Sequence, residues 1–220
     1  MTPNCDFELV APPWNLVGSG YIQLYRFDRD FVQKNGFLKD FQIKNFKGGW
    51  GAVMLVNYET SPIGPYVELL FIPGVISIAQ GNAYSISKIY VSTKASVENG
   101  IYNWGIPKEL ADFVWLKGKQ GDEVKVSANG IAFFEAKFKK NWFRFPISTA
   151  LFPLTIIQQL GEKLLLTKPS SKGMAHFAKM TNAKINSAYF PDVSQHSPLV
   201  TVKVENFTMK FTAARVISKE

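Results

Sequence analysis

The chain has 220 residues, of which 46% are hydrophobic and 14% aromatic, so it can bury a sizeable core. Charged residues make up 19%, too few for a disordered, highly charged chain. The net charge is +8, but only four basic residues are arginines and the lysines are scattered, which argues against a nucleic-acid-binding surface.

The sequence gives little sign of export, disulfides or membrane insertion. Cys5 is the single cysteine, which excludes an internal disulfide and a cysteine-based metal cluster. The first residues lack the basic and apolar regions of a signal peptide. The most apolar stretch, Thr149–Leu160, is interrupted by Pro153 and is too short to span a bilayer. We therefore expect a cytoplasmic protein that does not bind a membrane.

The first half of the chain predicts strands separated by turns and short helices. Segments rich in β-branched and aromatic residues predict strands over Gly20–Phe27, Trp50–Tyr58, Tyr66–Ile72 and Tyr84–Thr93. Asp28 is suited to cap a short helix that ends at Gly36. Ser96–Asn99 predicts one helical turn that Gly100 stops.

The second half adds a clear hairpin. Glu123–Ala128 and Ile131–Phe138 alternate apolar and polar residues around Asn129-Gly130, a pair that accepts the positive φ angles of a type I′ turn. Further strand-like segments are Met174–Met180, Ala183–Tyr189 and Thr201–Val216. Together the elements predict an α+β protein that is mainly antiparallel β, folded as a single domain over residues 1–220 with few short helices.

Metal and nucleotide sites are not predicted. His176 and His196 are the only histidines, and neither has a carboxylate at the spacing that a helical metal site needs. Gly18-Ser19-Gly20 lacks the third glycine of a dinucleotide-binding loop and leads into a strand. We therefore expect no metal and no cofactor.

One cluster of residues, between Asn99 and Phe113, suggests chemistry. Lys108 lies among aromatic and aliphatic neighbours, and Pro107 and Glu109 are suited to the first turn of a helix. Apolar neighbours and the helix dipole would both favour the neutral amine. A free lysine is only about 0.04% neutral at pH 7, so a lowered pKa could raise the amount of nucleophile roughly a thousandfold.

Local composition also permits other interpretations of Lys108. Its stem could cover apolar surface while the ammonium group stays in water. The carboxylate of Glu109 could stabilise the charged form, unless it points away. The residues alone leave these alternatives open.

The same cluster resembles a known family. Gly100–Leu110 resembles the Pro-Lys-x-Leu segment of the acetoacetate decarboxylase superfamily, in which the lysine forms a Schiff base; that lysine matches Lys108. Thr60–Glu68 (TSPIGPYVE) resembles a family segment that ends in an active-site glutamate, which matches Glu68, and Met180–Tyr189 is similar to a late strand. The resemblance implies curved antiparallel sheets that form a cone-shaped barrel, with catalytic roles for Lys108 and Glu68.

The chain departs from that family at several positions. The family's second lysine is replaced by Glu109, its N-terminal arginine has no counterpart in Asn15–Tyr21, and a second glutamate falls at Val53. Acetoacetate is therefore not the expected substrate. Two other segments, Pro12–Tyr25 and Val56–Ile76, resemble the plant proteins of the superfamily that are required for neoxanthin formation.

Two functions from different classes follow. The first is a Schiff-base-forming carbon–carbon lyase, of decarboxylase, aldolase or dehydratase type, that acts on a keto acid or related carbonyl compound through Lys108. Glu68 would orient the substrate or move protons, and Tyr66, Tyr102 and Trp104 are candidate walls of the substrate pocket or plain core aromatics.

The alternative is a non-catalytic or differently catalytic binder of an apolar, for example isoprenoid-like, small molecule. A purely structural or interaction domain is a third possibility. The expected partner is thus a small carbonyl compound or an apolar ligand. The family resemblance also implies that the protein could assemble into homo-oligomers.

Overall fold

A computed structural model describes residues 8–119, 121–150 and 154–217. Cys5 and Pro153, which figured in the predictions above, lie outside these residues.

Within the described residues, ten strands form one large sheet whose neighbouring strands are antiparallel, except for the parallel pair β7 and β8. In spatial order they are β8 (Lys108–Leu110), β7 (Lys88–Val91), β4 (Tyr66–Ile72), β3 (Gly51–Thr60), β1 (Trp14–Tyr25), β15 (Val200–Phe211), β14 (Ser170–Ile185), β11 (Ile131–Ser148), β10 (Asp122–Ala128) and β9 (Asp112–Lys117).

A smaller sheet of six short strands and three helices complete the described part of the chain. The strands, in spatial order, are β16 (Arg215–Ile217), β13 (Lys163–Thr167), β12 (Ile156–Leu160), β6 (Gly81–Tyr84), β5 (Val75–Ile78) and β2 (Phe46–Gly48). The helices are α1 (Arg29–Asn35), α2 (Asp40–Asn45) and α3 (Lys94–Trp104).

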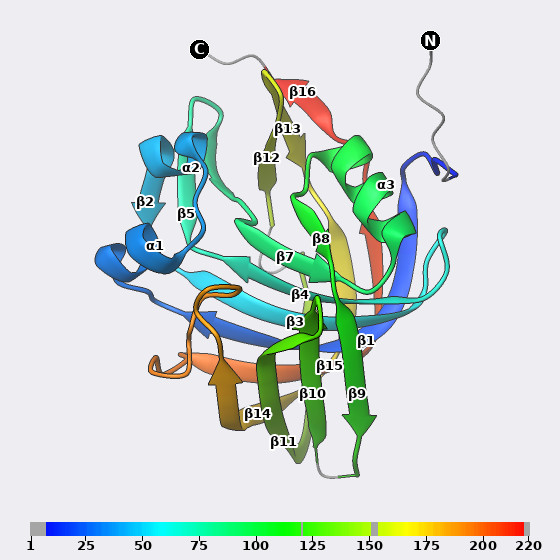
Figure 1. Ribbon diagram of the computed structural model, residues 1–220. Helices are drawn as coiled ribbons and strands as arrows, with labels where there is room; N and C mark the ends of the chain where they lie inside the picture. The colour runs from blue at the N-terminus through cyan, green and yellow to red at the C-terminus, as the bar shows by residue number, and fades with distance from the viewer. Residues whose placement is uncertain (1–7, 120, 151–153, 218–220) are drawn as a thin grey trace.

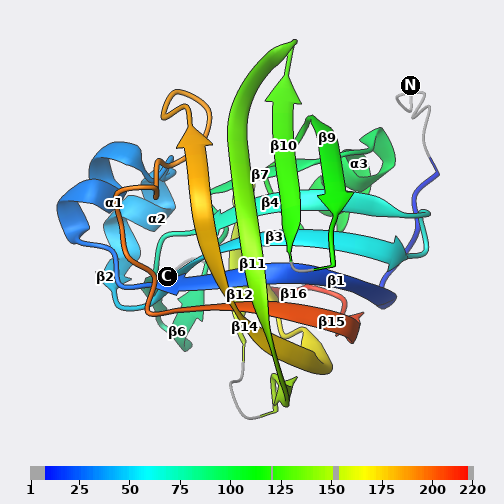
Figure 2. The same cartoon turned by 90° about the horizontal axis from the view of Figure 1, so that it is seen from below.

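The large sheet is strongly curled. In Figure 1, β9, β10 and β11 run steeply across the direction of β1, β3 and β4, and the view from below in Figure 2 shows the same crossing. The α+β fold that is mainly antiparallel β, with curved sheets and few helices, is confirmed.

Alternation along the strands divides the core between two faces of this sheet. Leu55 of β3 and Leu69 of β4 share a buried cluster with Phe134 of β11, so this face lies inside the curl. Leu70 of β4 instead joins a second buried cluster that includes Trp104 of α3. Glu68, two residues from Leu70 on the same strand, therefore faces α3.

Several local predictions are confirmed. The helix expected from Asp28 to Gly36 is α1, and the Asp28 carboxylate accepts a hydrogen bond from the backbone N–H of Phe31 at 2.8 Å. The hairpin of β10 and β11 turns at Asn129 and Gly130, whose φ angles are 52° and 77°. The predicted strand Met174–Met180 and the start of Ala183–Tyr189 form one long strand, β14, which ends at Ile185, so the last four residues of the second prediction are not strand.

The single strand predicted over Tyr84–Thr93 is wrong. β6 ends at Tyr84 in the smaller sheet, and β7 begins at Lys88 in the larger one. Ser85 and Ser87 lie in the segment that connects β6 of the smaller sheet to β7 of the larger one. The Ser85 hydroxyl accepts a hydrogen bond from a buried glutamine side chain, and the Ser87 hydroxyl donates one to a backbone carbonyl. Strand propensity does not reveal that a run of residues changes sheets.

Two predictions around Lys108 are also wrong. The helical turn predicted to stop at Gly100 continues through it as α3 and ends at Gly105, whose φ is 66°. The helix predicted to begin at Pro107 is not formed, because Lys108 starts strand β8 and pairs with Ile89 of β7. The helix dipole therefore does not act on Lys108 as predicted.

In the part of the chain that the structure describes, no helix has both the length and the apolar character needed to cross a bilayer.

Candidate active site

Lys108 and Glu68 lie together between the large sheet and α3. Their strands are both neighbours of β7, and α3 packs against β7 and β8 (Figure 1). The Lys108 Nζ is 3.5 Å from Glu68 Oε2, and the two side chains are only 5% and 7% exposed. The resemblance implied both residues, and the fold brings them within ion-pair distance.

Helix α3 supplies the other contacts of Lys108. Its Nζ donates a hydrogen bond to Ser96 Oγ at 2.9 Å. One turn further along α3, a Cβ on Gly100 would lie 2.5 Å from the Lys108 Cδ. A Cβ at that distance would fit only if Lys108 shifted, so Gly100 lets the stem of Lys108 pass against the helix.

Two tyrosines complete the site. The Tyr58 hydroxyl donates a hydrogen bond to Glu68 Oε1 at 2.9 Å, and the other carboxylate oxygen, Oε2, faces the Lys108 amine. The Tyr66 ring centroid is 4.9 Å from the Lys108 Nζ, a distance at which a cation is attracted to the ring face. The two rings pack against each other with centroids 4.6 Å apart.

Burial sets the protonation of these groups. It lowers the pKa of Lys108 below the ordinary 10.5, while the negative charge and hydrogen bonding of Glu68 oppose this shift. Burial, with the charge of Glu68, also raises the pKa of Tyr58 and Tyr66 well above 10. Both phenols therefore stay protonated, and the Lys108 amine is easier to deprotonate than a surface lysine.

Glu109 does not act on the amine. Successive residues of a strand point to opposite faces, and Glu109 is paired with Lys88 Nζ at 2.6 Å. The carboxylate next in sequence to Lys108 is therefore directed away from it.

The three predicted pocket aromatics are in different places. Tyr66 lies at the amine. Trp104 packs edge-on against Trp14 and Phe211, with both centroid distances 4.9 Å, and its Nε1 donates to a backbone carbonyl. Tyr102 is 62% exposed on α3.

The sequence reasoning missed Tyr58, Ser96 and the close approach at Gly100. Tyr58 could have been found, because a tight turn over Ser61–Pro65 pairs Tyr58 with Tyr66 and puts it diagonally beside Glu68. Ser96 could not, since it depends on how α3 packs against β8.

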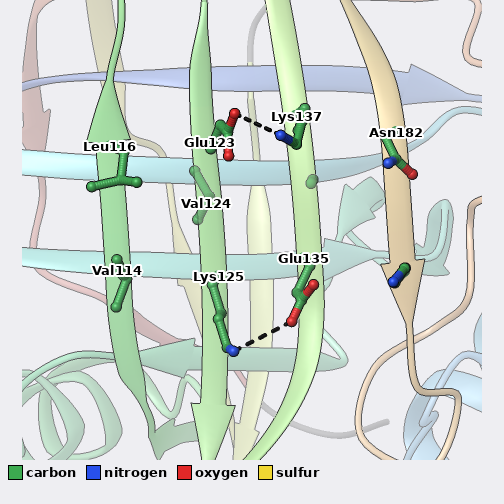
Figure 3. Close-up of a pocket in the computed structure, with 10 residues that line it drawn as sticks. Val114, Leu116, Glu123, Val124, Lys125, Glu135, Lys137 and Asn182 are labelled. Atoms are coloured by element: carbon green, nitrogen blue, oxygen red, sulfur yellow. Dashed lines mark hydrogen bonds and ion pairs between the residues drawn. The ribbon is translucent and has the colours of Figure 1, made fainter.

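A groove of about 360 Å³ lies elsewhere, on the outer face of β9, β10, β11 and β14 (Figure 3). Val114 and Leu116 are exposed along one side of it. Four of its five charged side chains pair with each other across the strands, Glu123 with Lys137 at 2.7 Å and Lys125 with Glu135 at 3.4 Å. Groups already paired at an open surface are a weaker candidate for catalysis than the buried site.

A second buried lysine faces the inside of the curled sheet. Lys203 Nζ is 2.8 Å from Asp122 Oδ2 and 5.2 Å from the Tyr21 ring centroid. Asp122 also accepts hydrogen bonds from Trp115 Nε1 at 3.0 Å and from the backbone N–H of Gly118 at 3.3 Å. This site repeats the lysine, carboxylate and tyrosine of the Lys108 site with a shorter ion pair, 2.8 Å against 3.5 Å.

The geometry thus defines a mainly antiparallel α+β protein with a lysine–glutamate pair buried under a helix. No known protein-family model matches the chain. No curated protein matches it in sequence either.

Solved structures do match. Acetoacetate decarboxylase from Legionella pneumophila superposes with a TM-score of 0.73 at 13% identity, over 94% of this chain and 88% of that chain. An acetoacetate decarboxylase-like enzyme from Sphingomonas wittichii gives 0.72 at 11%, over 96% and 95%. The enduracididine biosynthesis enzyme MppR, complexed with pyruvate, gives 0.65 at 16%, over 96% and 92%. The chain has the acetoacetate decarboxylase-like fold, as the resemblance implied.

Proposed function

We propose that the protein is an enzyme whose Lys108 forms an imine with a carbonyl compound, and that it makes or breaks a carbon–carbon bond. The observation that carries the proposal is the buried Lys108 amine, whose pKa is lowered by burial and which lies 3.5 Å from Glu68. A neutral amine is the form that attacks a carbonyl carbon.

Lys108 gives up its proton, and its neutral amine adds to the carbonyl carbon; once that proton is returned to the adduct, loss of water gives a protonated imine. That cation accepts the electron pair of a neighbouring carbon–carbon or carbon–hydrogen bond, and an enamine results. Glu68, fixed by Tyr58, stabilises the cation and is placed to accept or return the proton.

The relatives in fold support a carbonyl substrate in general terms. They include acetoacetate decarboxylase and MppR, which has been seen with the condensation product of pyruvate and imidazole 4-carboxaldehyde. At 11% and 16% identity these likenesses speak for the fold, so the proposal depends on the site itself.

Reductive trapping tests the proposal. The protein is incubated with a panel of ketones and aldehydes, reduced with borohydride and mapped by peptide mass spectrometry. We expect one dominant adduct, on the peptide that carries Lys108, and its loss in Lys108→Met. The remaining lysines of the same sample are the internal control. Labelling spread evenly over surface lysines would contradict the imine, and non-covalent retention of apolar ligands without an adduct would favour the binder instead.

A further inference from the structure

The charges around Lys108 are few and balanced. In the described part of the chain, Glu68 is the one charged group that acts on the pKa of Lys108, and it is also the one that acts on those of Tyr58 and Tyr66. The cation on the adjacent strand β7, Lys88, is bound to Glu109, which is directed away from Lys108. The site therefore holds one cation and one anion, with no further cation to receive a substrate carboxylate.

Apart from Lys108 and the Tyr58 hydroxyl, the strands beside Glu68 present apolar side chains. On the neighbouring strands it lies opposite Val56 and Val91, which are 8% and 0% exposed. A carboxylate brought to Lys108 would be buried beside apolar side chains and an existing negative charge. Burying an unpaired anion is strongly unfavourable.

We propose that the substrate of Lys108 is a neutral ketone or aldehyde and carries no carboxylate. This inference rests on the proposed function. When the ammonium form of Lys108 and a neutral carbonyl condense to a protonated imine and water, one positive charge is exchanged for another. Glu68 therefore has a counter-ion both before and after the condensation, and the net charge of the buried site is unchanged.

A keto acid would leave the site with one unpaired negative charge. Its imine is positive, but its carboxylate and Glu68 are both negative, and Lys108 can neutralise only one of them. The arrangement at Lys108 thus selects against the substrate that decarboxylation requires.

The reaction class follows from this charge balance. With a neutral β-hydroxy carbonyl compound, Glu68 accepts the hydroxyl proton as the Cα–Cβ bond breaks. The electron pair of that bond moves into the protonated imine of Lys108, which gives an enamine and releases a neutral aldehyde or ketone. Return of the proton and addition of water free the amine. The reverse sequence is an aldol-type condensation.

Two probes of nearly equal shape separate the alternatives. Acetoacetamide and acetoacetate differ mainly in the negative charge. Each is trapped with borohydride on the intact protein, and the rate of adduct formation on Lys108 is divided by the rate with free Nα-acetyl-lysine. We expect acetoacetamide to react faster by on the order of a hundredfold, because the acid must bury an unpaired charge.

The Glu68→Gln variant tests the cause. Glutamine keeps the shape and can still accept the Tyr58 hydrogen bond, but it carries no charge. We expect the preference for the amide to fall at least tenfold in this variant, while Lys108→Met gives the background for both probes.

The outcomes are distinct. A preference for acetoacetamide that Glu68→Gln weakens supports the inference. Equal or faster trapping of acetoacetate on Lys108 overturns it and leaves the imine-forming function standing. A preference that Glu68→Gln leaves unchanged removes its electrostatic basis. No adduct above the Lys108→Met background with either probe overturns the proposed function itself.

Discussion

Two lysines are buried in the described part of the protein, on opposite faces of the large sheet, and their partners differ. Lys203, inside the curl, is 2.8 Å from Asp122, which two further donors also hold. Lys108, under α3, is 3.5 Å from Glu68 and donates a hydrogen bond to the neutral hydroxyl group of Ser96. Both residues are 7% exposed, so burial does not distinguish them.

The difference lies in how well each charge is compensated. Burial would raise the pKa of Asp122, but the donors Lys203 and Trp115 outweigh it, and that pKa is lowered. At Lys108 the desolvation outweighs the attraction of Glu68, and the pKa of the amine is lowered. Removing one partner of a tight buried ion pair is strongly destabilising, whereas the looser pair at Lys108 leaves an amine that is easier to deprotonate than an ordinary lysine.

The largest effect on stability is expected at Lys203. Lys203→Met leaves Asp122 buried without its cation, and we expect a loss of about 3 kcal/mol in the free energy of unfolding, measured with urea. Because the pKa of Asp122 is lowered in the folded state, the pair stabilises above pH 3.8, and the loss should shrink as the pH falls below that value.

Lys137→Met is the matched control. Its pair with Glu123 is equally short, at 2.7 Å, but both side chains are 54% exposed. Exposed pairs contribute less than about 1 kcal/mol. Folded Lys203→Met should still be trapped on Lys108; if its adduct were lost as well, the assignment of separate roles to the two lysines would fail.

Next in size is the removal of the Tyr58 hydroxyl. Tyr58→Phe deprives Glu68 of a buried donor, and we expect unfolding to become easier by roughly 2 kcal/mol. The less stabilised carboxylate should act more strongly on Lys108 and raise the pKa of the amine, so trapping at neutral pH should slow.

Tyr25→Phe provides the contrast. The Tyr25 hydroxyl is buried and has no hydrogen-bond partner among the described residues. Its removal should leave stability unchanged or raise it slightly, with no effect on trapping. If the two variants lost equal amounts of stability, the hydrogen bond from Tyr58 to Glu68 would contribute nothing specific to the stability of the fold.

The smallest expected effect in energy is at Gly100. Alanine is favoured over glycine in a helix by up to about 1 kcal/mol, and the new Cβ would press on the flexible end of Lys108 rather than on backbone. We therefore expect Gly100→Ala to be nearly as stable as the parent protein but to be trapped about tenfold more slowly, because the amine is displaced.

Tyr102→Ala, on the exposed side of the same helix, should change neither the stability of the protein nor the rate of trapping on Lys108. If it slowed trapping as much as Gly100→Ala, the displacement of Lys108 would not be the reason, and Tyr102 would have to be reconsidered as a substrate contact.

The sequence predicted the pieces of this site that depend on pattern. The strand Tyr66–Ile72, which carries Glu68, is local, as is the Asn129-Gly130 hairpin elsewhere in the sheet. The resemblance pointed to Lys108 and Glu68. The sequence could not predict that Lys108 begins a strand, because Pro107 suits the start of a helix equally well. Only the pairing of Lys108 with β7 makes this segment a strand. Nor could the sequence predict the Lys203–Asp122 pair, whose members are 81 residues apart and meet only when the sheet curls.

The pH dependence of imine formation on Lys108 tests the central claim most directly. The rate of adduct formation with acetoacetamide is followed from pH 5 to 11, with free Nα-acetyl-lysine as the reference. Burial of the amine predicts that the midpoint for Lys108 lies below the ordinary value of 10.5, so that the adduct forms at a pH where the free amine is still charged. A midpoint at or above 10.5 would show that the attraction of Glu68 outweighs burial and would contradict Lys108 as the nucleophile.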